Sequence, residues 1–324
     1  MEKKSYIEVN SISSLYDFGI KRIVIAIGIF DGVHIGHQHL LNHLLKMSKK
    51  HNATPIALTF YPHPREVLRP DAPHAQLVPQ NEKIKLLHQY GVEGTVTIPF
   101  TKEFSIMRPK EFIEKILNSH QVRLCGICVG REWRFGANGS GDISLLKDYS
   151  EKGHFDFTAV EELLSGSEKV SSTSIRRAIA SGSLEFAEKM LGRPYSLFGN
   201  VEEGRKIASS VLGHPTANLN INSGIIPPNG LYAGYVVYNN KKYDAAIVIG
   251  TSPTFKHQFG EQRRVEVHLL DFSASLYEMN VEIIFKKYIR EERVFSSADE
   301  LKTQIKNDIE IIKAELRNKN SNSG

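Results

Sequence analysis

The first half of the chain alternates between short apolar runs and segments in which apolar residues recur at helical spacing. The apolar runs are rich in β-branched residues, as expected of strands that are buried on both faces. This alternation predicts a doubly wound parallel sheet of the Rossmann-like α/β class, which binds ligands at the carboxyl ends of its strands. The predicted strands are Ile23–Ile29, Pro55–Phe60, Gly94–Ile98, Leu124–Val129 and Phe155–Val160, and the predicted helices are Gln38–Lys49, Asn81–Gln89, Pro109–Ser119 and Ile143–Lys152.

The pattern changes beyond residue 195. Strand-like segments follow one another there without helices between most of them, and Asn239, Asn240 and the stretch around Gly260 are turn signals. This indicates an antiparallel β-barrel followed by an amphipathic helix over Ser297–Arg317. We therefore expect one domain over residues 1–185 and a second over residues 186–324. The predicted barrel strands are Leu231–Tyr238, Tyr243–Ile249, Arg264–Leu270 and Asn280–Phe285.

Composition and charge exclude several classes of protein. The net charge is +5, but the basic residues form short separated pairs, so we expect no nucleic-acid partner. The N-terminus has no apolar signal, no apolar run is long enough to span a bilayer, and only two cysteines are present. We therefore expect a cytoplasmic protein without a membrane partner. Cys125 and Cys128 form C-x-x-C in a predicted strand, and residues three apart on a strand should face opposite ways.

Residues 28–41, GIFDGVHIGHQHLL, connect the first predicted strand to the first predicted helix. Asp31 and Gly32 supply a turn, and Gly36 has no side chain to obstruct a ligand that approaches the backbone. His34 and His37 add imidazole donors beside a helix N-terminus, which already favours anions. This combination suits a phosphate group undergoing transfer and indicates nucleotidyl transfer. For so short a motif taken alone, two polar residues in a surface loop are the simpler alternative.

The chain resembles the prokaryotic bifunctional riboflavin kinase/FAD synthetase family along nearly its whole length. The resemblance depends on eight motifs that occur in the family's order. In the first half they are GIFDGVHIGH (Gly28–His37), TFYPHPREVL (Thr59–Leu68), VGREWRFGANGSGD (Val129–Asp142) and VSSTSIR (Val170–Arg176). In the second half they are LGRPY (Leu191–Tyr195), GHPTANL (Gly213–Leu219), PPNGLYA (Pro227–Ala233) and VEVHLLDF (Val265–Phe272).

The resemblance implies that the first domain transfers AMP from ATP to FMN, with FAD and pyrophosphate as products and Mg²⁺ as cofactor. It implies that His34 and His37 bind the ATP phosphates and stabilise the leaving pyrophosphate, and that Arg176 binds the β- and γ-phosphates. Glu132 and Trp133 depart from the family's usual Asp or Asn followed by Phe, and we expect activity to survive this. The other residues implied are Gly28, Phe30, Asp31, Gly36, Ser172 and Thr173 for ATP, and His63, Pro64, Glu132, Arg134, Phe135 and Gly136 for the flavin.

The resemblance also implies that the barrel phosphorylates riboflavin. Thr216 and Asn218 would bind Mg²⁺ and ATP, and Glu266 would act as general base. Ala208 and Ser209 stand where the family has a Gly-Arg pair in its phosphate loop, and a Cβ at a position of positive φ costs about 1 kcal/mol or more. We therefore expect an FAD synthetase whose kinase is weakened or lost, with a fully bifunctional enzyme as the alternative. Further departures are His214, Val248, Ser252 and Glu278.

Two rival functions share some of these features. HIGH and the nearby Lys46-Met-Ser-Lys-Lys50 imitate the two signatures of an aminoacyl-tRNA synthetase, but the second lies only ten residues after the first, on the same predicted helix. A non-catalytic flavin sensor would explain the altered barrel loop, although the motifs of the first domain argue against it. The expected partners are nucleotides and flavins, and the sequence gives no indication of oligomeric state.

Overall fold

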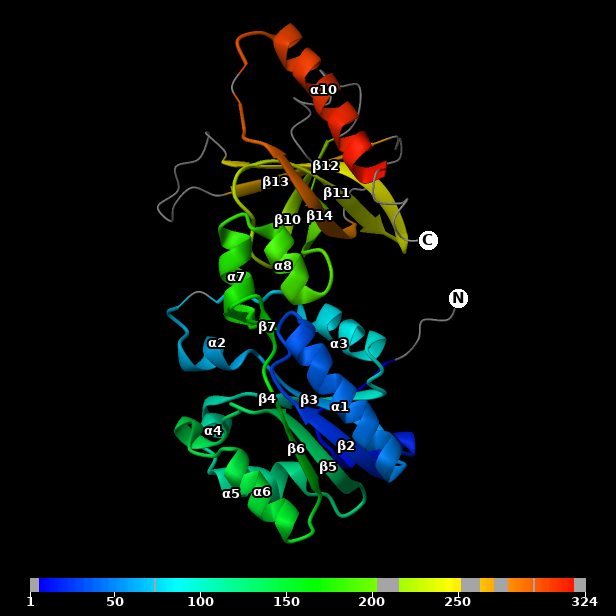
Figure 1. Ribbon diagram of the computed structural model, residues 1–324, viewed down its shortest axis with the longest axis vertical. Helices are drawn as coiled ribbons and strands as arrows, with labels where there is room; N and C mark the ends of the chain where they lie inside the picture. Colours follow the sequence, from blue (N-terminus) through cyan, green and yellow to red (C-terminus); the bar gives the residue numbers. More distant parts are fainter. Residues whose placement is uncertain are drawn as a thin grey trace. The chain divides into compact units, whose positions relative to one another are not determined.

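The computed structural model describes residues 6–72, 74–202, 216–251, 263–270, 279–293 and 295–317. The chain divides into two compact units, which are drawn in Figure 1 and described separately below. The N-terminal unit comprises residues 1–74 and 80–171, and the barrel unit comprises residues 75–79 and 172–324. The short segment 75–79 therefore belongs with the later part of the chain although it lies far upstream in the sequence.

The N-terminal unit is built on a six-stranded sheet in which all neighbouring strands are parallel. The strand order is β1-β4-β3-β2-β5-β6, so the order reverses between β2 and β5. Ligands of such sheets bind outside the carboxyl ends of the strands at this point of reversal. The strands are β1 (Ile7–Val9), β2 (Arg22–Ile27), β3 (Thr54–Tyr61), β4 (Gly94–Pro99), β5 (Arg123–Gly130) and β6 (Asp156–Val160).

Helices cover both faces of this sheet (Figure 1). Leu44 and Leu87 pack on one face with Val24, and Leu15 and Leu146 pack on the other, so alternate residues of each strand enter different core clusters. The first face is covered by α1 (Ile35–His51) and α3 (Gln80–Gln89), and the second by the 3₁₀ helix η1 (Ser13–Phe18), the π-helix η2 (Phe112–Leu117) and α6 (Ile143–Glu151). The short helices are α2 (Pro64–Leu68), α4 (Lys102–Ser105), α5 (Pro109–Glu111) and η3 (Ala137–Gly139), and β7 (Leu164–Ser165) pairs with β8 (Glu168–Lys169).

A bulge in β5 corrects the prediction for the two cysteines. Ile23 of β2 pairs with Leu124, but the next residue of β2 pairs with Gly126, so Cys125 is an extra residue on β5. The extra residue reverses the alternation of side chains, and Cys125 and Cys128 both enter the core cluster that contacts α1. The prediction that they face opposite ways is therefore wrong. Both thiols are free and buried, and burial raises the pKa of Cys128 to about 12, which makes this thiol unreactive at neutral pH.

The barrel unit contains a closed barrel of six antiparallel strands in the order β10-β13-β12-β11-β14-β9. Tyr232 and Phe285 are buried in this unit, and their ring centroids lie 5.3 Å apart at an angle of 85°. Such edge-to-face pairs add stability beyond the area that they bury. The strands are β9 (Ser196–Glu202), β10 (Thr216–Ser223), β11 (Gly230–Tyr238), β12 (Lys241–Thr251), β13 (Arg263–Leu269) and β14 (Asn280–Arg290).

Three helices pack within the described residues of the barrel unit. Ile312 and Leu316 of α10 (Ala298–Arg317) are buried with Leu231 of β11. The side chain of Arg290 on β14 also donates to the buried carboxylate of Asp308 on α10, at 2.6 Å, so both apolar contact and an ion pair hold α10 against the barrel. The other two helices are α7 (Ser172–Ala180) and α8 (Leu184–Leu191), which contact each other, and α8 also contacts β14.

The structure confirms the predicted fold class, with a parallel sheet followed by an antiparallel barrel and a C-terminal helix. The turn at Asn239 and Asn240 is also confirmed, because both residues have left-handed φ angles of 49° and 60°. The helix predicted over Pro109–Ser119 is instead α5 followed by η2, and the sequence did not predict β1, β9 or β10. The helices of the described ranges include none with the length and apolarity needed to cross a bilayer.

Candidate active site

Three of the sequence motifs follow neighbouring strands at the carboxyl edge of the parallel sheet. Gly28–His37 follows β2, the stretch after Tyr61 follows β3, and the stretch after Gly130 follows β5. These three strands are adjacent in the order β3-β2-β5, and the order reverses between β2 and β5. The topology therefore brings the three segments together where an open α/β sheet binds ligands.

The turn after β2 is held in an uncommon backbone conformation. Phe30 has φ 55° and Val33 has φ 40°, and both side chains are fully buried. Non-glycine residues in this region carry strain, which persists only where the surroundings hold the backbone in place. The buried ring of Phe30 anchors the turn, and a Cβ on Gly28 would come within 3.3 Å of that ring. Asp31, at the tip of the turn, is also buried, with 4% of its surface exposed.

His34 and His37 form a stacked pair at the N-terminus of α1. The ring centroids lie 3.6 Å apart with an interplanar angle of 17°. His34 is the N-cap of α1, and its Nδ1 accepts a hydrogen bond from the backbone N–H of His37 at 3.3 Å. A neutral imidazole whose Nδ1 accepts carries its proton on Nε2, so His34 presents a donor. Nδ1 of His37 is buried and has no hydrogen-bond partner among the described residues.

Gly36 makes this stacked arrangement possible. A Cβ at Gly36 would lie 3.2 Å from two atoms of the His34 ring, which is tighter than ordinary van der Waals contact. The sequence suggested that Gly36 admits a ligand to the backbone, and the structure adds that it leaves room for the ring of His34. The spacing H-x-G-H therefore has a direct geometric reason.

Burial keeps His37 uncharged near neutral pH. Desolvation lowers its pKa well below the ordinary value of 6.5, and the neighbouring His34 and Lys83 lower it further through their charges. The side chain of Lys83 on α3 is buried, and its Nζ donates to the carbonyl oxygen of Ile29 and to Oγ1 of Thr59, at 3.3 Å each. A buried cation therefore lies next to the turn that carries the two histidines.

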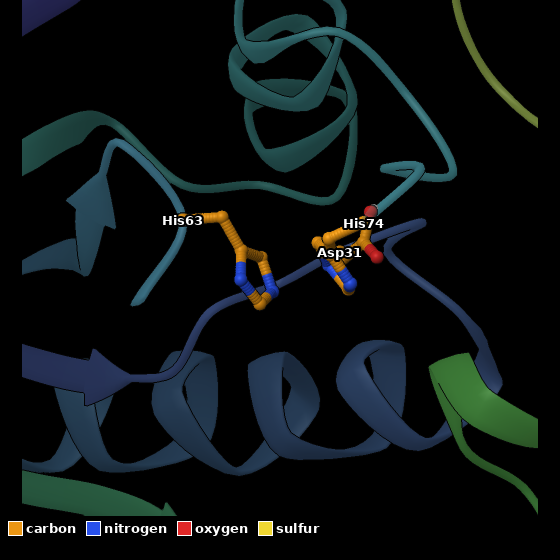
Figure 2. A group of neighbouring side chains, drawn as sticks. All are labelled: Asp31, His63 and His74. Carbon is orange, nitrogen blue, oxygen red and sulfur yellow. The ribbon is translucent and has the colours of Figure 1, made fainter. Parts of the chain in front are cut away.

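His63 and Pro64 open the short helix α2 after β3. Nδ1 of His63 accepts from the backbone N–H of Arg65 at 3.1 Å, so this ring also presents Nε2–H as a donor. Figure 2 shows Asp31, His63 and His74 converging from separate segments of the chain, and one potential ligand atom of each lies within 4.8 Å of the others. The rings of His63 and His74 are 4.0 Å apart between centroids.

This group of three does not fit Mg²⁺. Magnesium prefers oxygen ligands and is usually held by carboxylates together with substrate phosphates, whereas two of the three groups here are imidazoles. In addition, Nδ1 of His63 already accepts a hydrogen bond, which leaves its Nε2 protonated and unable to coordinate a metal. Among the residues that the structure describes, no other set of three His, Cys, Asp or Glu side chains lies close enough to hold an ion.

The loop after β5 divides its predicted flavin residues between surface and core. Glu132 is exposed and pairs with Lys169 at 2.5 Å, and Arg134 pairs with Asp142 at 3.2 Å. Phe135 is instead buried in the core. Its ring stacks on Trp133 with centroids 4.6 Å apart. Gly136 has φ 71°, and a Cβ there would lie 2.7 Å from the ring of Pro109, so only glycine suits this position.

The phosphate-type segment Ser172–Arg176 belongs to the barrel unit. Ser172 and Thr173 lie in the first turn of α7, with Thr173 exposed. The guanidinium Nε of Arg176 donates to the carbonyl oxygen of Ala75 at 2.8 Å, within the same unit. This bond fixes the segment 75–79 to α7, a local role that the sequence did not predict.

In the barrel, Asn218 on β10 lies directly opposite Glu266 on β13. Both residues are half-buried, and Nε of Arg264 pairs with Oε1 of Glu266 at 3.0 Å. Thr216 begins β10, two residues before Asn218. Val248 pairs with Glu266 on the other side, in β12. The altered loop Gly204–Gly213, with Ala208 and Ser209, and His214, Ser252, Gly260 and Glu278 lie outside the described residues.

Sequence reasoning missed Lys83 and His74. Lys83 had a usable signal, because it shares the buried face of α3 with Ile84 and Leu87, and a lysine at an apolar position of an amphipathic helix is unusual. His74 lies in an irregular segment, and no periodic pattern marks it.

Comparisons with known proteins also divide the chain into an N-terminal part and a C-terminal part. A family model described as FAD synthetase matches residues 19–174, and a model described as riboflavin kinase matches residues 191–316. A solved structure described as a macrolide-efflux protein of Streptococcus pneumoniae has the same fold, with a TM-score of 0.81 and 28% sequence identity, and the match covers 95% of this chain and 98% of that one.

Curated relatives are similar over most of their length. The bifunctional riboflavin kinase/FMN adenylyltransferase of Buchnera aphidicola subsp. Schizaphis graminum is 38% identical over 291 residues, which cover 89% of this chain and 92% of the relative. The protein of the same description from Escherichia coli strain K12 is 35% identical over 286 residues, which cover 88% and 90%. The chain therefore belongs to the family of bifunctional riboflavin kinase/FMN adenylyltransferases.

Proposed function

We propose that this chain is an FMN adenylyltransferase, which joins the AMP of ATP to FMN and releases pyrophosphate. The observation that carries the proposal is the stacked pair of His34 and His37 at the N-terminus of α1, next to the reversal point of the sheet. A helix N-terminus with imidazole donors suits a triphosphate, and membership of the family supports the same assignment.

The reaction requires positioning and charge stabilisation rather than a covalent protein intermediate. An oxygen of the FMN phosphate attacks the α-phosphorus of ATP, and the bond from that phosphorus to the oxygen bridging it to the β-phosphorus breaks. The electron pair of that bond leaves with pyrophosphate. His34 donates through Nε2–H, and the positive N-terminal end of the α1 dipole stabilises the same negative charge. Because His37 is uncharged near neutral pH, it acts in this proposal as a hydrogen-bonding group rather than as a cation.

The other predicted residues keep the roles that the family resemblance implies. Gly28, Phe30, Asp31 and Gly36 shape the ATP site through the strained turn, and Ser172, Thr173 and Arg176 contribute donors to phosphate oxygens. The phosphates of ATP would supply most of the oxygen ligands that Mg²⁺ prefers, and the bound ion would offset their negative charge. For the flavin, His63, Pro64, Glu132 and Arg134 are contact candidates, whereas Phe135 and Gly136 support the loop that carries two of them.

A second activity of the barrel, phosphorylation of riboflavin to FMN, is favoured by one specific observation. Asn218 and Glu266 are direct cross-strand partners, so the residues that the resemblance implies as a ligand for Mg·ATP and as general base are neighbours. Thr216 would supply the hydroxyl that, with Asn218, holds Mg²⁺ there. The substitutions in the phosphate loop lead us to expect a weakened kinase.

Chromatographic separation of flavins tests both activities. The purified protein is incubated with Mg·ATP and either FMN or riboflavin, with oxidised and reduced flavin in parallel. FAD from FMN supports the adenylyltransferase, and FMN from riboflavin would restore the fully bifunctional enzyme. No product from either substrate would contradict both assignments and favour a non-catalytic flavin sensor.

A further inference from the structure

Lys83 is a buried cation that neither the family motifs nor the proposed mechanism uses. Only 5% of the residue is exposed. Its side chain extends from α3 to the edge of the sheet, next to residues 28–37, which we call the HIGH turn. Its Nζ donates to the carbonyl oxygen of Ile29 and to Oγ1 of Thr59, and that hydroxyl also donates to the same carbonyl at 3.2 Å. A buried ammonium of this kind is rare unless it is paired or functional.

Charged groups from three neighbouring elements act on this ammonium. Burial lowers the pKa of Lys83 to about 8, while the carboxylates of Asp31, Glu8 and Glu66 oppose that shift. These carboxylates come from the turn after β2, from β1 and from α2. On the α1 side, the charge of Lys83 contributes to the lowered pKa of His37. The electrostatics of the HIGH turn and of Lys83 are therefore coupled.

We propose that Lys83 is a positioning residue for the triphosphate of ATP, which holds the strained turn through Ile29 and supplies a buried positive charge beside His37. The inference rests on the proposed adenylyl transfer, because it assigns Lys83 to that same site. A cation that is already desolvated and fixed by two hydrogen bonds reorganises little when a triphosphate arrives. Lys83 therefore acts on ATP mainly through its field and through the shape of the turn.

The hydrogen bonds distinguish this role from a purely structural one. If the ammonium is removed, Ile29 still accepts from Thr59, so the turn keeps one of its two side-chain contacts. A Lys83→Met variant should therefore fold. It should bind ATP more weakly than the wild type, while its affinity for FMN should change little. Lys85→Met is the matched control, because Lys85 lies on the same helix but is half exposed and pairs with Glu82, one turn earlier in the helix.

Calorimetry of ATP binding tests the proposal without turnover, with His34→Ala identifying the heat that comes from the N-terminal site. We expect Lys83→Met to weaken ATP binding at that site about tenfold or more at pH 7, and to raise KM for ATP with little change in KM for FMN. The fluorescence of Trp133, the single tryptophan, confirms that the N-terminal unit is folded in each variant. Lys85→Met should bind ATP as the wild type does.

The pH dependence separates charge from shape. In the wild type, ATP affinity should fall between pH 7 and 9 as Lys83 loses its proton, while Lys83→Arg should hold its affinity constant over this range. Wild-type affinity for ATP in Lys83→Met, or the same alkaline loss in Lys83→Arg as in the wild type, would overturn the inference. If the wild type binds ATP but makes no FAD, the proposed function fails while the assignment of Lys83 to an ATP site stands on the calorimetry.

Discussion

The two units present their candidate chemistry in different ways. In the N-terminal unit, His34 is buried, caps a long helix and stacks on His37, and the turn before it is anchored by the buried ring of Phe30. In the barrel, Glu266 and Asn218 project from neighbouring strands, and Glu266 pairs with an exposed arginine of its own strand. The first candidate site is built from strand ends and a helix N-terminus, and the second from residues within neighbouring strands.

This difference in construction determines where each unit tolerates changes in sequence. A substitution in the HIGH turn disturbs buried contacts as well as ligand contacts, because Gly28 and Gly36 both lie against aromatic rings. In the barrel, the strands carrying Glu266 can stay intact while the sequence of a connecting loop changes. A changed loop sequence is therefore compatible with a well-formed barrel, and we expect the two proposed activities to be separable by mutation.

Replacing His34 or His37 with alanine should have the largest effect on one proposed activity without affecting the other. We expect either change to lower FAD formation from FMN by about a hundredfold or more, since each removes a preorganised group from the developing charge. Formation of FMN from riboflavin, where present, should change little. The two rates are measured on the same preparation by flavin chromatography.

Gln38→Ala is the control for this experiment, because Gln38 lies in the same first turn of α1 and its Nε2 donates to the backbone carbonyl of Val33 at 2.9 Å. Trp133 fluorescence verifies folding. Full FAD formation in both histidine variants would show that the adenylyl site lies elsewhere.

Glu266→Gln should produce the opposite result. If the barrel is active, loss of the general base should lower FMN formation from riboflavin by about a hundredfold, while FAD formation from FMN stays unchanged. Gln preserves the volume and keeps hydrogen-bonding groups opposite Asn218, so the strand pairing should persist. A fall in both activities would contradict the independence of the two sites.

Much of the fold could be predicted because periodicity records burial. β2 to β6 and β11 to β13 appear close to their predicted bounds, since buried strands and alternating strands leave clear patterns, whereas β14 continues five residues beyond its predicted end to Arg290. The sequence could not show the bulge at Cys125, because an extra residue in one strand is defined only by the register of its partner. η2 was predicted as ordinary α-helix because a six-residue segment is too short for its apolar spacing to distinguish i→i+5 from i→i+4 hydrogen bonding.

The candidate site was less predictable than the fold. The HIGH motif identified the chemistry, but it could not reveal that Gly36 makes room for the His34 ring or that His34 caps α1. Phe135, predicted as a flavin residue, is buried under Trp133, and motif membership alone does not separate contact from support. Lys83 comes from another helix, so only the tertiary fold brings it to the HIGH turn.

Arg264→Gln should have a smaller effect, again confined to the proposed activity of the barrel. Nε of Arg264 pairs with Oε1 of Glu266 at 3.0 Å, so a substrate hydroxyl must compete with the guanidinium for that oxygen. Because a partly exposed ion pair is worth about 0–1 kcal/mol, we expect FMN formation to rise by at most about fivefold, with FAD formation unchanged. The measurement is the initial rate with riboflavin, and an unchanged or lower rate would show that the pair does not restrain Glu266.

The smallest effect concerns the stability of the N-terminal unit in acid. Burial lowers the pKa of His37 well below its ordinary value of 6.5. At a pH between the pKa of the folded state and 6.5, the unfolded chain therefore binds more protons than the folded chain. The unit should therefore lose stability as the pH falls below 6.5, by about 1 kcal/mol at one pH unit lower, and gain nothing further above 6.5. Urea unfolding followed by Trp133 fluorescence reports this unit alone.

His37→Gln should flatten the acid decline, whereas His120→Gln, which removes an exposed histidine of the same unit, should not. An identical decline in the wild type and His37→Gln would mean that His37 accepts a proton without cost in the folded state, and it would then act on phosphate as a cation.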